Sequence, residues 1–169
     1  INTKEVTVNN NTYTAWDTSS VTNMKRMFNE SNVFNQDISK WDVSNVTNME
    51  WMFKRSIFCK DISDWDVSNV TNMNRMFNGG RFNKNIKSWN VESVTNFTGM
   101  FADNIRFIED LREWNVDVNS IISGMFSDST LMNILDERTV DIESNRNEYF
   151  SNKDATYYEY FDNKSKRNT

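Results

Sequence analysis

Apolar residues recur along the chain with a fixed period of about two dozen positions. The tryptophans that follow this period are 25, 24, 24 and 25 residues apart, at Trp16, Trp41, Trp65, Trp89 and Trp114. Pairs of methionine and phenylalanine keep the same step. Self-similarity at such a period is typical of stacked repeats, because one unit alone cannot bury its apolar face. The pattern therefore predicts a repeat protein.

Within one unit, two different spacings follow one another. Residues 41–43, Trp-x-Val, alternate between apolar and polar as a strand does. Residues 49–53, Met-x-x-Met-Phe, have the spacing of one apolar helix face. Thr47 and Glu50 fit a capping box at the start of that helix. Each unit is predicted to be a short strand, a turn and a short helix, with successive strands stacked in parallel.

The pattern changes at both ends of the chain, which predicts three parts. Residues 1–12 are predicted to form an N-terminal cap, a strand or hairpin around an Asn-rich turn. Residues 13–131 carry the repeats and are predicted to form about five coils. Residues 132–169, where the motif fades, are predicted to be a C-terminal cap and tail. The predicted fold class is α/β, a solenoid of short parallel strands and short helices with a cap at each end.

Composition narrows the chemistry that the chain can perform. The net charge is −5, from 24 acidic and 19 basic residues, which argues against a nucleic-acid partner. There is no histidine and one cysteine, Cys59, so Ser/His/Asp triads and His-based zinc sites are excluded. A glycosidase-type pair of carboxylates stays formally open, but the acidic residues recur at scaffold positions instead of converging. We expect no enzymatic activity, no cofactor and no metal site.

The stretch FNQDISKWDVSNVTNMEWMF, at residues 34–53, resembles the repeat of BspA-like surface proteins, which are abundant among mycoplasma lipoproteins. The resemblance covers about residues 13–131 and weakens in the fifth unit. It implies a right-handed leucine-rich-repeat-like solenoid and a role in adhesion or recognition. Similar repeats also occur in protists and large DNA viruses.

The polar positions beside the predicted strands form rows across the coils. In a solenoid of this kind, the strand face is rigid and its outward side chains are free of packing. A solvated face without a ligand explains the same rows, and so does a surface for a basic partner or calcium. The residues predicted to contribute to a binding surface are Lys40, Asp42, Asp64, Asp66, Glu92 and Glu113.

Trp51 is the sixth tryptophan and lies outside the periodic row. It occupies the slot that Arg26 and Arg75 hold in neighbouring units, which indicates an outward position. One interpretation is an exposed aromatic anchor for a partner. The other is a ring that lies flat on the outer surface, covered by Arg26 or Arg75.

Together these observations predict a non-enzymatic recognition or adhesion module at the cell surface or outside the cell. The expected partner is a protein or a glycan that binds the strand face. The alternative is a structural component of a coat or virion, in which the chain packs against neighbouring subunits. No apolar run approaches the length of a membrane span, so no transmembrane segment is expected.

Overall fold

The computed structural model describes residues 2–8, 10–131 and 150, and it begins with a β-hairpin. Strands β1 (Asn2–Val8) and β2 (Asn11–Asp17) pair antiparallel. The turn between them contains Asn10 at φ 62°, a conformation that asparagine tolerates better than most residues. The N-terminal segment thus forms a hairpin, and its second strand runs to Asp17, past the predicted boundary at residue 12. The predicted cap at 132–169 lies outside the described residues, except Phe150.

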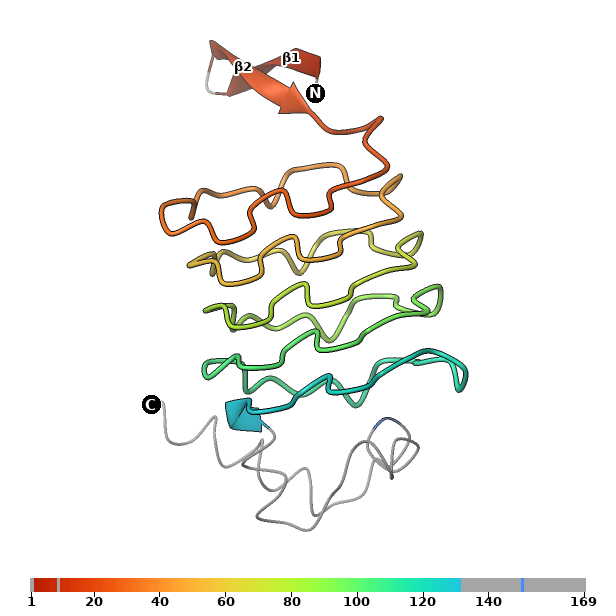
Figure 1. Ribbon diagram of the computed structural model, residues 1–169. Coiled ribbons are helices and arrows are strands. Elements are labelled where there is room, and N and C mark those ends of the chain that lie inside the picture. Colours follow the sequence, from red (N-terminus) through yellow and green to blue (C-terminus); the bar gives the residue numbers. More distant parts are fainter. Residues whose placement is uncertain (1, 9, 132–149, 151–169) are drawn as a thin grey trace.

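After β2 the chain winds through coils that stack one upon another below the hairpin (Figure 1). Neighbouring coils are joined by isolated parallel bridges between equivalent residues. We number the coils by these bridging residues, from coil 1 to coil 5: Asn23, Asn48, Asn72, Asn96 and Ile121. The predicted stacking of the repeats in parallel is therefore present in the structure.

The predicted α/β fold, a leucine-rich-repeat-like solenoid of strands and helices, is wrong. Among the described residues, the hairpin forms the single named sheet, and helical geometry is confined to Thr130, Leu131 and Phe150. The coils consist of consecutive turns, and each contributes one bridging residue to its neighbours. Most apolar positions of the repeat are buried as predicted. The backbone that carries them forms turns instead of the predicted strand and helix.

The helices are absent because the backbone hydrogen bonds of that segment run between coils. The N–H of Arg26 donates to the carbonyl of Glu50 in the next coil at 2.9 Å, and alternate N–H groups beside it do the same. Arg26 itself has φ 59°, and the equivalent Trp51 and Arg75 have φ 58° and 48°. A right-handed helix does not accommodate positive φ. The methionines instead face inward from successive turns in which an N–H bonds to the carbonyl three residues earlier.

The turn that precedes each such segment is stabilised by an asparagine side chain. In coil 2, Asn48 Oδ1 accepts a hydrogen bond from the N–H of Glu50 at 2.9 Å. The same bond recurs at Asn23, Asn72 and Asn96. The predicted capping box does not form, since the Thr47 hydroxyl donates to the carbonyl of Thr22 in coil 1.

The core consists of columns of equivalent side chains that run along the stack. Trp65, Trp89 and Trp114 are buried, and each indole N–H donates to an isoleucine carbonyl of the preceding coil at 3.0 to 3.1 Å. The predicted internal tryptophan column is confirmed for these three. A phenylalanine column lies beside it, with ring centroids 5.5 to 5.8 Å apart, formed by Phe28, Phe53, Phe77, Phe101 and Phe126.

Candidate binding surface

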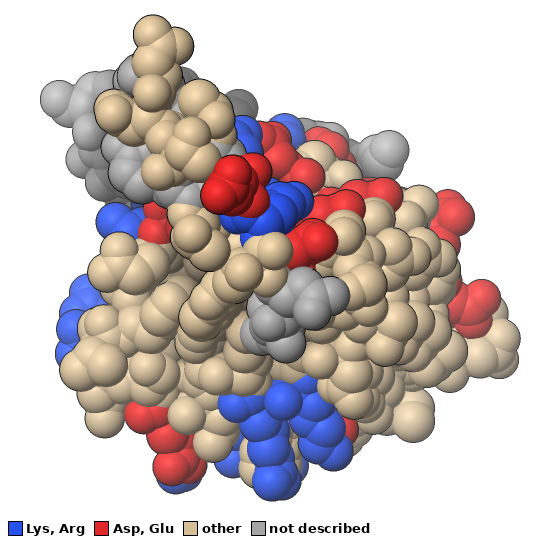
Figure 2. Space-filling model, turned by 90° about the horizontal axis from the view of Figure 1, so that it is seen from above, with Lys and Arg blue, Asp and Glu red and all other residues tan. Residues whose placement is uncertain are grey.

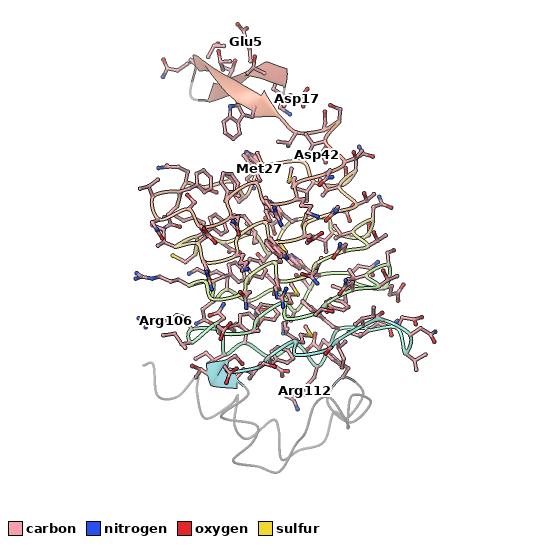
Figure 3. The ribbon with its side chains drawn as sticks, viewed as in Figure 1. Glu5, Asp17, Met27, Asp42, Arg106 and Arg112 are labelled. Atoms are coloured by element: carbon pink, nitrogen blue, oxygen red, sulfur yellow. The ribbon has the colours of Figure 1, made fainter. Side chains whose placement is uncertain are left out.

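The acidic residues predicted to lie on strands lie instead on tight turns at the edge of the coils. Asp42 Oδ1 accepts hydrogen bonds from the N–H of Ser44 at 3.0 Å and from its hydroxyl at 2.6 Å. Asp66 and Ser68 repeat this arrangement one coil further along. Figure 3 shows Asp42 on the same side of the molecule as Asp17, which caps the corresponding turn of coil 1. These carboxylates therefore stabilise turns and also line one surface.

Hydrogen bonding makes these carboxylates stronger acids than usual. The pKa of Asp42 lies below the ordinary value of 3.8, because the hydroxyl and then the backbone N–H of Ser44 favour the ionised form. The pKa of Asp66 is lowered in the same way by Ser68, against opposing contributions from burial and then from the charge of Asp42. The row thus stays negatively charged at neutral pH.

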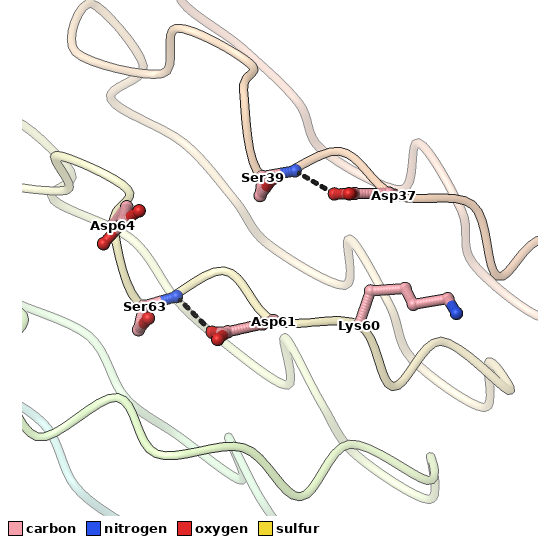
Figure 4. A pocket seen from close by; sticks show the side chains of 6 residues that line it. All are labelled: Asp37, Ser39, Lys60, Asp61, Ser63 and Asp64. Atoms are coloured by element: carbon pink, nitrogen blue, oxygen red, sulfur yellow. Dashed lines mark hydrogen bonds between the residues drawn. The ribbon is translucent and has the colours of Figure 1, made fainter.

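A second row of turns encloses a shallow hollow of about 290 Å³ between the equivalent turns at Asp37 and Asp61 of neighbouring coils. Figure 4 shows Asp37 and Asp61, which each accept a hydrogen bond at 2.9 Å from a serine N–H two residues later. The hollow is lined by Asp37, Ser39, Lys60, Asp61, Ser63 and Asp64. A similar hollow of about 340 Å³ follows, lined by Asp61, Ser63, Lys84, Asn85, Lys87 and Ser88. The coils thus repeat a small polar depression that contains both signs of charge.

The remaining predicted site residues form loose pairs across the coils. Lys40 Nζ lies 4.0 Å from Asp64 Oδ2, and the two side chains are 89% and 78% exposed. Glu113 lies 3.7 Å from Lys87, and Glu92 accepts a hydrogen bond from Asn115 at 2.7 Å. Exposed pairs of this kind contribute about 0–1 kcal/mol to stability. The fold therefore does not depend on the identity of Lys40 and Asp64.

Trp51 lies on a different run of the coil and is partly buried. Its indole N–H donates to Asn74 Oδ1 at 2.9 Å. The guanidinium carbon of Arg26 is 4.3 Å from the ring centroid, and Lys54 Nζ is 4.1 Å from it. These distances are typical of cation–π contacts. The ring is thus covered by Arg26, as in the second interpretation, and also by Lys54, whose contact the repeat spacing did not indicate.

Three residues of the first hollow, Asp37, Lys60 and Asp61, were not among the predicted binding residues. The recurring Asp-x-Ser spacing was the available signal, since aspartate commonly bonds to the backbone two residues later in turns. Among the described residues, no group of three or more histidine, cysteine, aspartate or glutamate side chains is placed to hold a metal ion. In that same part of the chain, no helix has the length and apolar character needed to span a membrane.

The periodic bridges, the aromatic columns and the polar turn rows define a class, a repeat protein of stacked coils with a 24- or 25-residue period. The chain belongs to the family described as "Mycoplasma protein of unknown function, DUF285", which matches residues 2–81 and 57–158. No curated protein matched the chain. No solved structure matched it either.

Proposed function

We propose that the chain is a non-enzymatic recognition module of a BspA-like surface protein, displayed at the cell surface or outside the cell. Its binding face is the side of the stack that carries the polar turns. The partner is a protein or a glycan that contacts Lys40 and Asp64 together with the acidic row. Membership of the mycoplasma family and the repeat motif support this assignment.

The observation that carries the proposal is the exposed pair formed by Lys40 and Asp64. These side chains stand at equivalent positions of neighbouring coils, yet one is basic and the other acidic. The two coils that carry them have the same aspartate-capped turns, at Asp42 and at Asp66. A constant scaffold with variable exposed charges is the arrangement that a recognition surface uses, because the rigid backbone loses little entropy on binding.

Charge reversal at Asp64 tests this surface without disturbing the turns. We expect Asp64→Lys to weaken binding to host cells, or to a ligand found on a glycan array, by about tenfold, because one favourable charge contact becomes repulsive. Binding is measured by flow cytometry with the labelled chain. Glu5→Lys is the matched control, since Glu5 is an exposed carboxylate on the hairpin.

Two outcomes would count against the proposal. Equal binding by Asp64→Lys and the wild type would remove this face from the interaction. Equal loss in Asp64→Lys and Glu5→Lys would indicate a general charge effect. Thermal unfolding of both variants, followed by circular dichroism, verifies that they remain folded.

A second candidate function is structural, in which the chain packs against neighbouring subunits of a coat or virion. Val118 and Ile121 favour it, because both are exposed apolar side chains in coil 5. Sedimentation of the purified chain at several concentrations tests this role. If the chain remains monomeric at the highest concentration, the structural role is contradicted.

A further inference from the structure

Basic side chains surround Trp51 on the run of turns where helices were expected. Arg26 in coil 1 and Lys54 in coil 2 both contact the ring, and Arg55 follows Lys54 in the chain. Arg75 holds the same slot in coil 3, where its backbone continues the ladder of bonds between coils. We define the Trp51 patch as Arg26, Trp51, Lys54, Arg55 and Arg75.

The arginine stems of this patch lie along the axis of the stack. A Cβ added at Gly99 would come within 3.1 Å of Arg75 Cγ, so Arg75 covers the glycine of the next coil. A Cβ added at Gly79 would likewise meet Arg55 Cγ at 3.2 Å. Arg26 covers Trp51 in the same manner. Side chains held in this way have less rotational freedom to lose when a ligand binds.

The charge of the patch is strongly positive although the whole chain is acidic. Two exposed carboxylates lie close to its four cations: Glu30, at 3.9 Å from Arg55, and Asp103, which borders Gly79 together with Arg55. The nearby Glu50 is engaged by Lys25 at 2.8 Å and so contributes little net charge. Figure 2 shows a cluster of lysine and arginine side chains at the lower edge of the molecule, in a view where other basic and acidic side chains lie elsewhere on the same face.

We propose that the Trp51 patch binds a linear sulfated polysaccharide that runs along the stack. Arg26 and Arg75 occupy equivalent positions in the coils before and after that of Trp51. Their guanidinium groups are therefore arranged along the axis of the stack. Guanidinium forks bind sulfate groups through two parallel hydrogen bonds, as they bind phosphate and carboxylate. Clusters of lysine and arginine are typical of heparin-binding surfaces.

Two observations favour a polysaccharide over nucleic acid. Single-stranded nucleic acids bind through bases that stack on open aromatic faces, whereas Arg26 and Lys54 already lie over the ring of Trp51. A wide polyanion such as a duplex would also approach the remaining surface of a chain whose net charge is −5. A single, narrow polysaccharide chain would contact the Trp51 patch without approaching that remaining surface.

This site differs from the face of Lys40 and Asp64, and the inference does not rest on the proposed function. The test uses heparin as the probe and measures its affinity for the whole chain by calorimetry at several salt concentrations. We expect Arg26→Gln/Arg75→Gln to weaken binding by about tenfold or more, because two charge-assisted contacts are lost. We also expect the salt slope to fall by about two, one for each lost cation.

The matched control is Lys84→Gln/Lys87→Gln, which removes the same charge from the second polar hollow. It should change the affinity by less than about twofold. Equal loss in the two double variants would show attraction to total charge alone and would overturn the proposal. So would failure of the wild type to bind heparin, or tighter binding of a single-stranded oligonucleotide of the same charge. Lys54→Gln, expected to weaken binding by several fold, provides a second variant if the arginine pair fails to fold.

Discussion

The first and the central coils share a motif but give its tryptophan very different surroundings. Trp16, at the junction of β2 and coil 1, is 47% exposed, whereas Trp89 is 3% exposed. The indole N–H of Trp89 donates to the carbonyl of Ile62, in the coil before it. Trp16 lies within β2, opposite Thr3 of β1, and has no coil before it, although its ring lies 5.6 Å from that of Trp41. The same residue therefore contributes according to its neighbours, as expected when each unit contacts only the next.

Truncation of the two tryptophans should show the largest difference between these regions. Trp89→Ala removes a buried ring and leaves the Ile62 carbonyl without its indole donor, so we expect it to lower the free energy of unfolding by about 3–5 kcal/mol. Trp16→Ala should lower it by about 1 kcal/mol. Urea denaturation followed by circular dichroism measures both. Equal losses would mean that position in the stack does not decide the contribution.

A smaller effect is expected in the slot that requires positive φ. Gly99 has φ 58°, and a Cβ there would meet Arg75 at 3.1 Å, so Gly99→Ala should destabilise the chain by about 1–2 kcal/mol. Arg75→Ala serves as the control, because that position already carries a Cβ at φ 48°. It should cost less than about 0.5 kcal/mol. Urea denaturation of both variants decides, and an unchanged Gly99→Ala would contradict the assigned backbone.

The smallest expected effect is on the acid sensitivity of stability, to which the aspartate caps contribute. A cap in the first coil and a cap in a central coil should contribute equally. The pKa of Asp17 is lowered first by the Ser19 hydroxyl and that of Asp66 by the Ser68 hydroxyl. Because the folded pKa lies below the unfolded one, the stabilisation is present above the unfolded pKa and is lost as the pH falls through the folded pKa. The melting temperature of the wild type should therefore decrease as the pH is lowered past about 4.

Asp17→Asn and Asp66→Asn should each reduce that acid sensitivity by a similar small amount, because each cap involves a serine two residues away. Melting curves between about pH 2 and pH 6 provide the measurement. A much larger change for Asp66 than for Asp17 would show that the caps, like the tryptophans, depend on neighbouring coils.

The core could be predicted from the sequence because its apolar positions recur in every unit. Trp65, Trp89 and Trp114 needed only their shared spacing to be placed in one column. The backbone could not be predicted in the same way, since Met-x-x-Met-Phe fits both a helix face and a series of turns. Bonds such as Arg26 N–H to Glu50 carbonyl join residues far apart in sequence and decide between the two. The glycines at 99 and 124, in the slot of Arg26, were the local signal for positive φ.

The candidate surfaces were predicted in part for the same reason. Equivalent positions indicated that Arg26 could cover Trp51, because the unit length fixes which side chains are neighbours along the stack. The contact of Lys54 with the ring required the observed turn, which brings a residue three positions later over the indole. Likewise, the bond of Asp42 to Ser44 depends on a turn where a strand was expected.

The hydrogen bonds between the coils also give the stack a direction. In the run from Met24 onward, each coil donates its N–H groups to the carbonyl groups of the coil that follows. Along that run one face of a coil therefore presents donors and the other acceptors, whereas at Thr47 the direction is reversed and the N–H donates to the carbonyl of Thr22 in the preceding coil. If copies of such a stack met end to end through these faces, donors would meet acceptors only in a head-to-tail arrangement. Along this run, a two-fold symmetric contact between two such faces would oppose like groups.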